Sequence, residues 1–205
     1  MKKLLTTLLC AMLTLCAFAQ LECSDENVNT HLKFKGIPID GAPSEFARQL
    51  GIRGFVGCHY TNTSNGDEYV CYEGFFAGYK DCKIAIKSSN ASDNLVCEIV
   101  VILPQEHSRK ALYNTYFSLK EMLTRKYGEP TSIKERGKRP KWRNSDYDKF
   151  SEITQKHNQY YSVFSSTKDG VGTIHLEIKD YGYIGIHYED LENSSKKEEQ
   201  VLNDL

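Results

Sequence analysis

The chain has 205 residues, and its 26 lysine and arginine residues against 27 aspartate and glutamate residues give a net charge of -1 at pH 7. A chain of this length, with 40% hydrophobic residues, can bury a core of ordinary size. The balanced charge does not provide the basic surface that nucleic-acid binding requires, so we exclude nucleic acid as the main partner.

The N-terminus has the pattern of a secretory signal peptide. Lys2 and Lys3 precede an uncharged apolar run over 4–18, and Ala17 and Ala19 frame a small-x-small cleavage site. We therefore predict a signal peptide over 1–19 and an exported protein, periplasmic or secreted, over 20–205. The alternative is an uncleaved anchor, because the run approaches the roughly 20 residues that span a bilayer. No later segment approaches that length, so we expect no transmembrane segment after cleavage.

The first half of the exported chain predicts one short helix followed by strands. Residues 31–40 read as a strand that ends in a turn, and residues 41–54 read as a short amphipathic helix. Alternating apolar residues separated by turn residues then predict four strands in meander order, within 55–60, 68–76, 79–86 and 94–103.

The second half predicts a long helix followed by more strands. Apolar residues recur at helical spacing within 108–130, and Gly128 gives the expected C-terminal stop. After a polar, basic segment over 134–156, three alternating strands follow, at 160–166, 172–180 and 182–190. The charged tail over 192–205 either forms a terminal helix or frays.

These elements predict an α+β fold, in which antiparallel meanders carry one short and one long helix on a sheet face. No linker or low-complexity segment divides the chain. We therefore expect one compact domain over 20–205, with two similar lobes, 31–103 and 108–190, as the alternative.

Four segments carry a resemblance to a known family: HLKFKGIPIDGAPSEF, EGFFAGYKDCKI, YFSLKEMLTRKYGEP and the closing VLNDL. They resemble a family of signal-peptide-bearing exported proteins of gut anaerobic bacteria whose function is not known. The resemblance implies an exported α+β protein. Its motifs are turns and helix ends, so it carries no catalytic residue to this chain.

Five cysteines remain after cleavage, and in an exported protein the first expectation is disulfides. A symmetric hairpin over the loop that follows 55–60 puts Cys58 opposite Cys71. A symmetric hairpin over the loop that follows 79–86 puts Cys82 opposite Cys97. Directly opposed positions are within disulfide reach. We predict these two bridges, with Cys23 left over. The alternatives are a Cys71–Cys82 bridge and four buried thiols.

The last two strands bring two histidines together. A three-residue loop at 180–182 keeps their apolar residues on one face, and it puts His175 opposite His187 with Glu189 on the same polar face. Two imidazoles and a carboxylate are ligands that zinc accepts. The alternative is a solvated outer face that is polar by alternation alone.

The segment between the long helix and the last strands is strongly basic around the only tryptophan. It suggests contact with a polyanion such as an acidic glycan or a lipid headgroup, or else a solvated connection. The ligand-binding candidates in this segment are Lys138, Arg139, Lys141, Trp142 and Arg143.

No nucleophile elbow, metalloprotease or phosphate-binding motif is present in the sequence. We therefore predict a disulfide-supported binding or interaction module of the bacterial envelope, with a protein or a glycan as ligand, no cofactor and no identified catalytic residues. The alternative is a zinc-dependent hydrolase centred on His175, His187 and Glu189.

Overall fold

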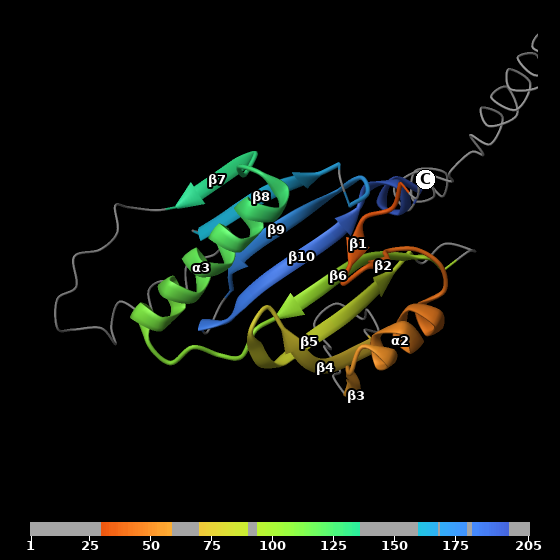
Figure 1. Cartoon of the computed structure of the whole chain (residues 1–205), viewed down its shortest axis with the longest axis horizontal. Coiled ribbons are helices and arrows are strands. Elements are labelled where there is room, and N and C mark those ends of the chain that lie inside the picture. The colour runs from red at the N-terminus through yellow and green to blue at the C-terminus, as the bar shows by residue number, and fades with distance from the viewer. Residues whose placement is uncertain are drawn as a thin grey trace, which may run out of the picture.

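The structure is a computed structural model that describes residues 30–58, 70–89, 94–135, 160–167, 169–179 and 182–196. Its main feature is an antiparallel sheet of eight strands in the order β3-β4-β5-β6-β10-β9-β8-β7 (Figure 1). The strands are β3 (Val56–Cys58), β4 (Val70–Phe76), β5 (Tyr79–Ser88), β6 (Val96–Ile102), β7 (Ser132–Glu135), β8 (Tyr160–Ser166), β9 (Gly172–Ile178) and β10 (Ile184–Asp190). The predicted α+β fold is confirmed.

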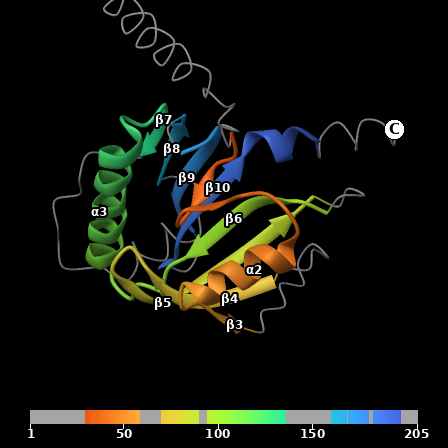
Figure 2. The ribbon, with the colours of Figure 1, turned by 45° about the vertical axis from the view of Figure 1, so that its right-hand side comes forward.

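Two helices cover the same face of this sheet (Figures 1 and 2). The short helix α2 (Pro43–Ile52) packs on β3 and β5, and the long helix α3 (Arg109–Tyr127) packs on β8 and β9. The Ser108 hydroxyl caps α3 by accepting from the Ala111 N–H, and Gly128 ends it at a φ of 91°. None of the described helices is long and apolar enough to cross a membrane.

The core fills the space between the helices and this sheet face. Alternation along the strands sends every second side chain into it, so that the apolar residues of β5, β6, β9 and β10 meet those of α2 and α3. The fully buried members with the largest side chains include Phe34, Phe46, Leu112, Tyr116 and Phe164. The remaining alternate positions lie on the opposite side, which we call the helix-free face because no described helix covers it.

The sheet consists of two meanders with the same order of elements. Helix α2 leads into β3-β4-β5-β6, and α3 leads into β7-β8-β9-β10. The last strands of the two meanders, β6 and β10, pair antiparallel in the middle of the sheet. The two halves are therefore arranged symmetrically about the β6–β10 pairing.

Two local predictions differ from the structure, and the prediction for the tail is tested only in part. Residues 31–40 form a small hairpin, β1 (Lys33–Phe34) and β2 (Ile37–Pro38), because Lys35 and Gly36 both take positive φ in a tight turn. Strand β7 is missing from the prediction, because its sequence, SIKE, gives little alternation. Of the tail, residues 191–196 are helical, and 197–205 lie outside the described residues.

The N-terminal segment is held against the ends of β9 and β10 by a buried aspartate. Asp190, fully buried, accepts from the Leu32 N–H at 2.7 Å and from the Asn193 N–H at 3.0 Å. The Asn193 amide in turn donates to the Ile39 and Val96 carbonyls. One polar cluster thus connects the N-terminal hairpin, β6 and β10, and because it is buried each of its groups needs these partners.

Close backbone contact in the same region requires a glycine at position 170. A Cβ on Gly170 would lie 1.8 Å from the His31 carbonyl oxygen, and the residue has a φ of +95°. Gly170→Ala therefore combines backbone strain with a clash against main-chain atoms, and we expect it to lower the free energy of unfolding by about 3 kcal/mol in urea.

The matched control is Gly41→Ala, since Gly41 also has a positive φ, of +72°, but a Cβ added there would meet no heavy atom within 4 Å. We expect it to cost about 1 kcal/mol from backbone strain alone. Equal losses for the two variants would contradict the close approach at Gly170.

Candidate functional site

A row of side chains crosses the helix-free face from one edge of the sheet to the other. Each member is the register partner of the next, so the row is a direct consequence of the strand pairing. The row consists of Cys58, Cys71, Ala85, Val100, His187, His175, Val163 and Ser132. Its polar centre lies on β9 and β10, where the sequence predicted that the two histidines would be opposed.

This prediction is confirmed: His175 and His187 are register partners, and their ring centroids are 5.9 Å apart. The Lys179 N–H donates to the Tyr183 carbonyl and closes the predicted loop, of which 180 and 181 lie outside the described residues. Gly182 has the positive φ, 80°, that such a loop needs.

His187 lies between two carboxylates, and we call this arrangement the His187 clamp. Its Nδ1 is 2.5 Å from Glu98 Oε1 on β6. Its Nε2 is 3.2 Å from Glu177 Oε1 on β9, which is an ion-pair contact rather than an aligned hydrogen bond. A neutral imidazole has one N–H and would turn a lone pair towards one of these carboxylates, so the clamp favours the imidazolium. Burial alone would lower the pKa of His187, but the two carboxylates outweigh it and raise the pKa.

Two lysines complete the charge balance of the clamp. Lys87 Nζ lies 2.8 Å from Glu98 Oε2, and Lys179 donates to the Glu177 carboxylate. Gly185, the register partner of Glu177, leaves room for Lys179, because a Cβ there would lie 2.4 Å from the Lys179 Cε. The two carboxylates and the cationic side chains that they contact thus come from β5, β6, β10 and the end of β9.

The same contacts keep both carboxylates ionised. Burial would raise the pKa of Glu98, but hydrogen bonds from His187 and Lys87 outweigh burial and lower it to about 2. For Glu177, burial is likewise outweighed, by His187 and Lys179, and its pKa is also lowered to about 2. At neutral pH the clamp therefore consists of two carboxylates, one imidazolium and two ammonium groups.

His175 differs from His187 in its environment. Burial is the main cause that lowers its pKa, so the ring is neutral at pH 7. Its ring meets the ring of Tyr161 edge-on, with centroids 5.3 Å apart, and its buried Nε2 has no hydrogen-bond partner among the described residues. A neutral imidazole with an unused nitrogen thus lies beside a charged one.

The third predicted metal ligand, Glu189, lies beside the clamp on the same sheet face, as the register partner of Glu98, and its carboxylate is not part of the clamp. Glu189 is exposed, pairs with Thr173 and accepts from the Thr173 hydroxyl at 3.3 Å. In the described part of the chain, no group of three or more histidine, cysteine, aspartate or glutamate side chains is placed to hold a metal ion. The described residues therefore give the zinc alternative no support.

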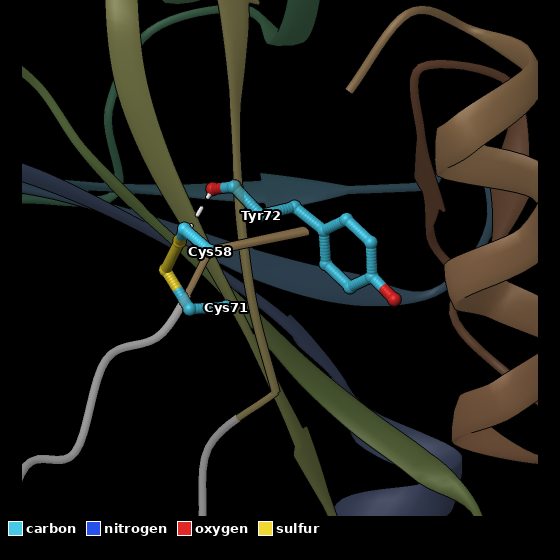
Figure 3. The surroundings of a disulfide bond; sticks show 3 residues. All are labelled: Cys58, Cys71 and Tyr72. Carbon is cyan, nitrogen blue, oxygen red and sulfur yellow. Dashed lines mark hydrogen bonds between the residues drawn. A yellow bond between two sulfur atoms is a disulfide. The ribbon is translucent and has the colours of Figure 1, made fainter. Parts of the chain in front are cut away.

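The predicted bridge between Cys58 and Cys71 is confirmed (Figure 3). The two residues are register partners on β3 and β4, with Cα atoms 5.2 Å apart. Figure 3 shows that the disulfide and the Tyr72 ring leave β4 on opposite sides, with the ring directed towards α2. The bridge therefore belongs to the helix-free face and fastens the outermost strand to its neighbour.

The predicted bridge between Cys82 and Cys97 is wrong, and both residues are thiols. The hairpin closes between Ser89 and Leu95, and Ile84 pairs with Val101 rather than with Leu95. Cys97 then lies beside Lys87, at a register shift, five residues along β5 from Cys82. Five residues of strand correspond to roughly 16 Å, which is beyond disulfide reach. Burial raises the pKa of the Cys82 thiol to about 11, so it is not a reactive thiolate.

The basic ligand-binding candidates, Lys138 to Arg143, lie outside the described residues. The other groups around His187 were not assigned to this site from the sequence; they are Lys87, Glu98, Glu177 and Lys179. The only signal for Glu98 is one carboxylate within the apolar strand VCEIVVI. Its partner, His187, is 89 residues away.

We compared the chain with known proteins, and no comparison found a match. No protein-family model matches the chain, and neither a curated protein nor a solved structure matches it.

The lowered pKa of Glu98 predicts a loss of stability in acid. Because the folded pKa lies below the ordinary value of 4.5, its contribution is present above pH 4.5 and is lost as the pH falls towards 2. That contribution reaches up to about 3 kcal/mol. We expect Glu98→Gln to lower stability at pH 7 and to flatten the pH dependence between 5 and 2 in urea titrations.

Glu121→Gln, at an exposed position of α3, is the matched control and should keep the wild-type slope. A Glu98→Gln profile parallel to that of the wild type would contradict the clamp.

Proposed function

We propose that this protein is an exported binding module that holds a glycan on the helix-free face of its sheet, at the His187 clamp. Export is supported by the signal-peptide pattern over 1–19 and by the Cys58–Cys71 disulfide, which is typical of oxidising compartments. The resemblance to exported proteins of gut anaerobic bacteria agrees with this proposal.

The observation that carries the proposal is the density of planar polar groups in the middle of a sheet face. Four of them, Glu98, Glu177, His175 and His187, come from three adjacent strands. A row of ion pairs at such positions stabilises a sheet little better than apolar pairs of the same size, since each charge loses hydration. Binding gives these groups a purpose that stability alone does not.

The chemistry of the groups suits hydroxyl-rich ligands. Each ionised carboxylate has more lone pairs than the clamp uses. The Tyr161 ring, beside His175, offers an apolar surface next to these acceptors. Sugars present hydroxyl donors around an apolar ring face, which is the complementary pattern.

The clamp argues for binding rather than proton transfer. His187 uses both ring nitrogens on carboxylates, so it has no free nitrogen with which to remove a proton from a substrate. Both carboxylates are ionised and paired with lysines, so neither serves as an acid at neutral pH.

Affinity electrophoresis in gels that contain a soluble polysaccharide tests the proposal. The probes are three neutral polysaccharides, namely dextran, mannan and laminarin, with polygalacturonate as the anionic comparison. We expect at least one neutral polysaccharide to retard the wild type. Tyr161→Ala and Glu177→Gln should each weaken the retardation at least tenfold, because they remove the ring surface and one acceptor.

Glu121→Gln on α3 is the control and should be retarded as the wild type is. Circular dichroism melts establish that each variant is folded. Failure of all three neutral polysaccharides to retard the wild type, or equal retardation of every variant, would overturn the proposal.

A further inference from the structure

A second surface with binding chemistry lies at the β3 edge of the sheet. Strand β3 is outermost, and no described strand pairs with its outer side. In an antiparallel sheet, alternate residues of such a strand direct their N–H and C=O groups outwards, where they can pair with another chain. The Cys58–Cys71 disulfide fixes β3 on β4, so this edge is held in strand conformation before any partner arrives.

Large apolar side chains are exposed around this edge. Ile52 at the end of α2 is 69% exposed, Val56 on β3 is 70% exposed and Phe75 on β4 is 56% exposed. Val56 pairs with Glu73, so Phe75 lies diagonally across from Val56 on the same side of the sheet. Ile52 belongs to α2, which covers the other side of the sheet, so we call Val56 and Phe75 the edge patch. Gly57 lies between Val56 and the disulfide and adds no side chain that would block an approaching strand.

The opposite edge of the sheet is built differently. Strand β7 has the charged residues Lys134 and Glu135 in its four-residue sequence, and charge is the usual protection of an exposed edge. Strand β3, with the sequence VGC, contains no charge. Of the two edges of the sheet, β3 is therefore the one that can accept a strand.

The rim of the edge patch is cationic. Lys35 donates to the Phe75 carbonyl at 3.2 Å, and Arg53 donates to the Lys35 carbonyl at 3.0 Å. Among the described residues, the groups that accept from Lys35 and Arg53 next to the patch are thus backbone carbonyls. The positive charges of the two side chains are therefore not neutralised by these contacts. Of the carboxylates in this region, Glu73 is the register partner of Lys83, a pair that adds no net charge, and Asp81 on β5 lies near Cys82, as Lys35 does, and offsets one of the two positive charges. A second copy of the chain would bring the same cations together, whereas an acidic ligand would neutralise them.

We propose that the β3 edge binds an extended segment of a partner protein by strand addition, and that this segment alternates apolar residues and carries acidic residues beside them. Main-chain hydrogen bonds to β3 supply the pairing, the edge patch holds the apolar side chains, and Lys35 and Arg53 meet the carboxylates. This surface is separate from the glycan site, and its ligand belongs to a different class.

The test uses the full exported chain and a synthetic peptide in which three valines alternate with threonines between two aspartates at each end. Two comparison peptides replace the aspartates with lysines or the central valine with proline. Backbone amide NMR should show shifts at Val56, Gly57 and Cys58 with the acidic peptide. The lysine peptide should bind at least tenfold more weakly, and the proline peptide, which lacks a ladder N–H, should lose binding.

Val56→Lys places a charge on the edge and should weaken binding of the acidic peptide at least tenfold. Ile133→Lys, at a 50% exposed position on β7, is the matched control and should bind as the wild type does. The proposal is overturned if the acidic peptide causes no shifts, if the shifts fall on β7, or if the proline peptide binds equally well. Concentration-dependent dimerisation abolished by Val56→Lys would also overturn it, since a second copy would then occupy the edge.

Discussion

The pairing of β6 with β10 is the constraint on which the rest of the structure depends. Each meander alone is a four-stranded sheet with one helix, and this single antiparallel seam makes one sheet of eight strands. On the core side the seam brings Ile99 opposite Tyr188 and Val101 opposite Ile186, all buried. On the helix-free face it brings Glu98 to His187. The fold and the candidate site are therefore products of the same strand register.

The two halves share an order of elements and differ in chemistry. Across the helix-free face, the first half contributes the disulfide, Ala85 and Val100, while the second half contributes the two histidines and Val163. In this row the first half is thus apolar, and it ends at the disulfide-fixed β3 edge. The charged groups of the clamp meet at the seam, where the first half supplies Lys87 and Glu98 and the second half supplies His187, Glu177 and Lys179. The proposed division, with glycan binding over the histidines and peptide binding at the edge, follows from this asymmetry.

The sequence allows local pairings to be predicted and leaves distant ones open. The alternation of apolar and polar residues, together with Gly182, sufficed to predict that His175 lies opposite His187. The loop between the two strands is short, and only a few strand registers keep their apolar residues on one face. The same reasoning failed for Cys82 and Cys97, since the turn between β5 and β6 is centred later than expected, so that Ile84 pairs with Val101 instead of Leu95, and a register shift lies between Lys87 and Ser88. Glu98 could not be assigned to His187, because only the β6–β10 seam joins them and no local pattern specifies that pairing. The hydrophobic residues of α3 were predictable because helical spacing is itself local.

The protonation of His187 at neutral pH tests the central claim most directly. Nitrogen-proton correlation NMR of the imidazole rings at pH 7 should show both ring nitrogens of His187 protonated, and His175 with one bare nitrogen. On titration, His187 should lose its proton only above the ordinary pKa of 6.5, and protein stability should fall as the pH rises through that transition. A bare nitrogen on His187 at pH 7, or titration at or below 6.5, would contradict the clamp.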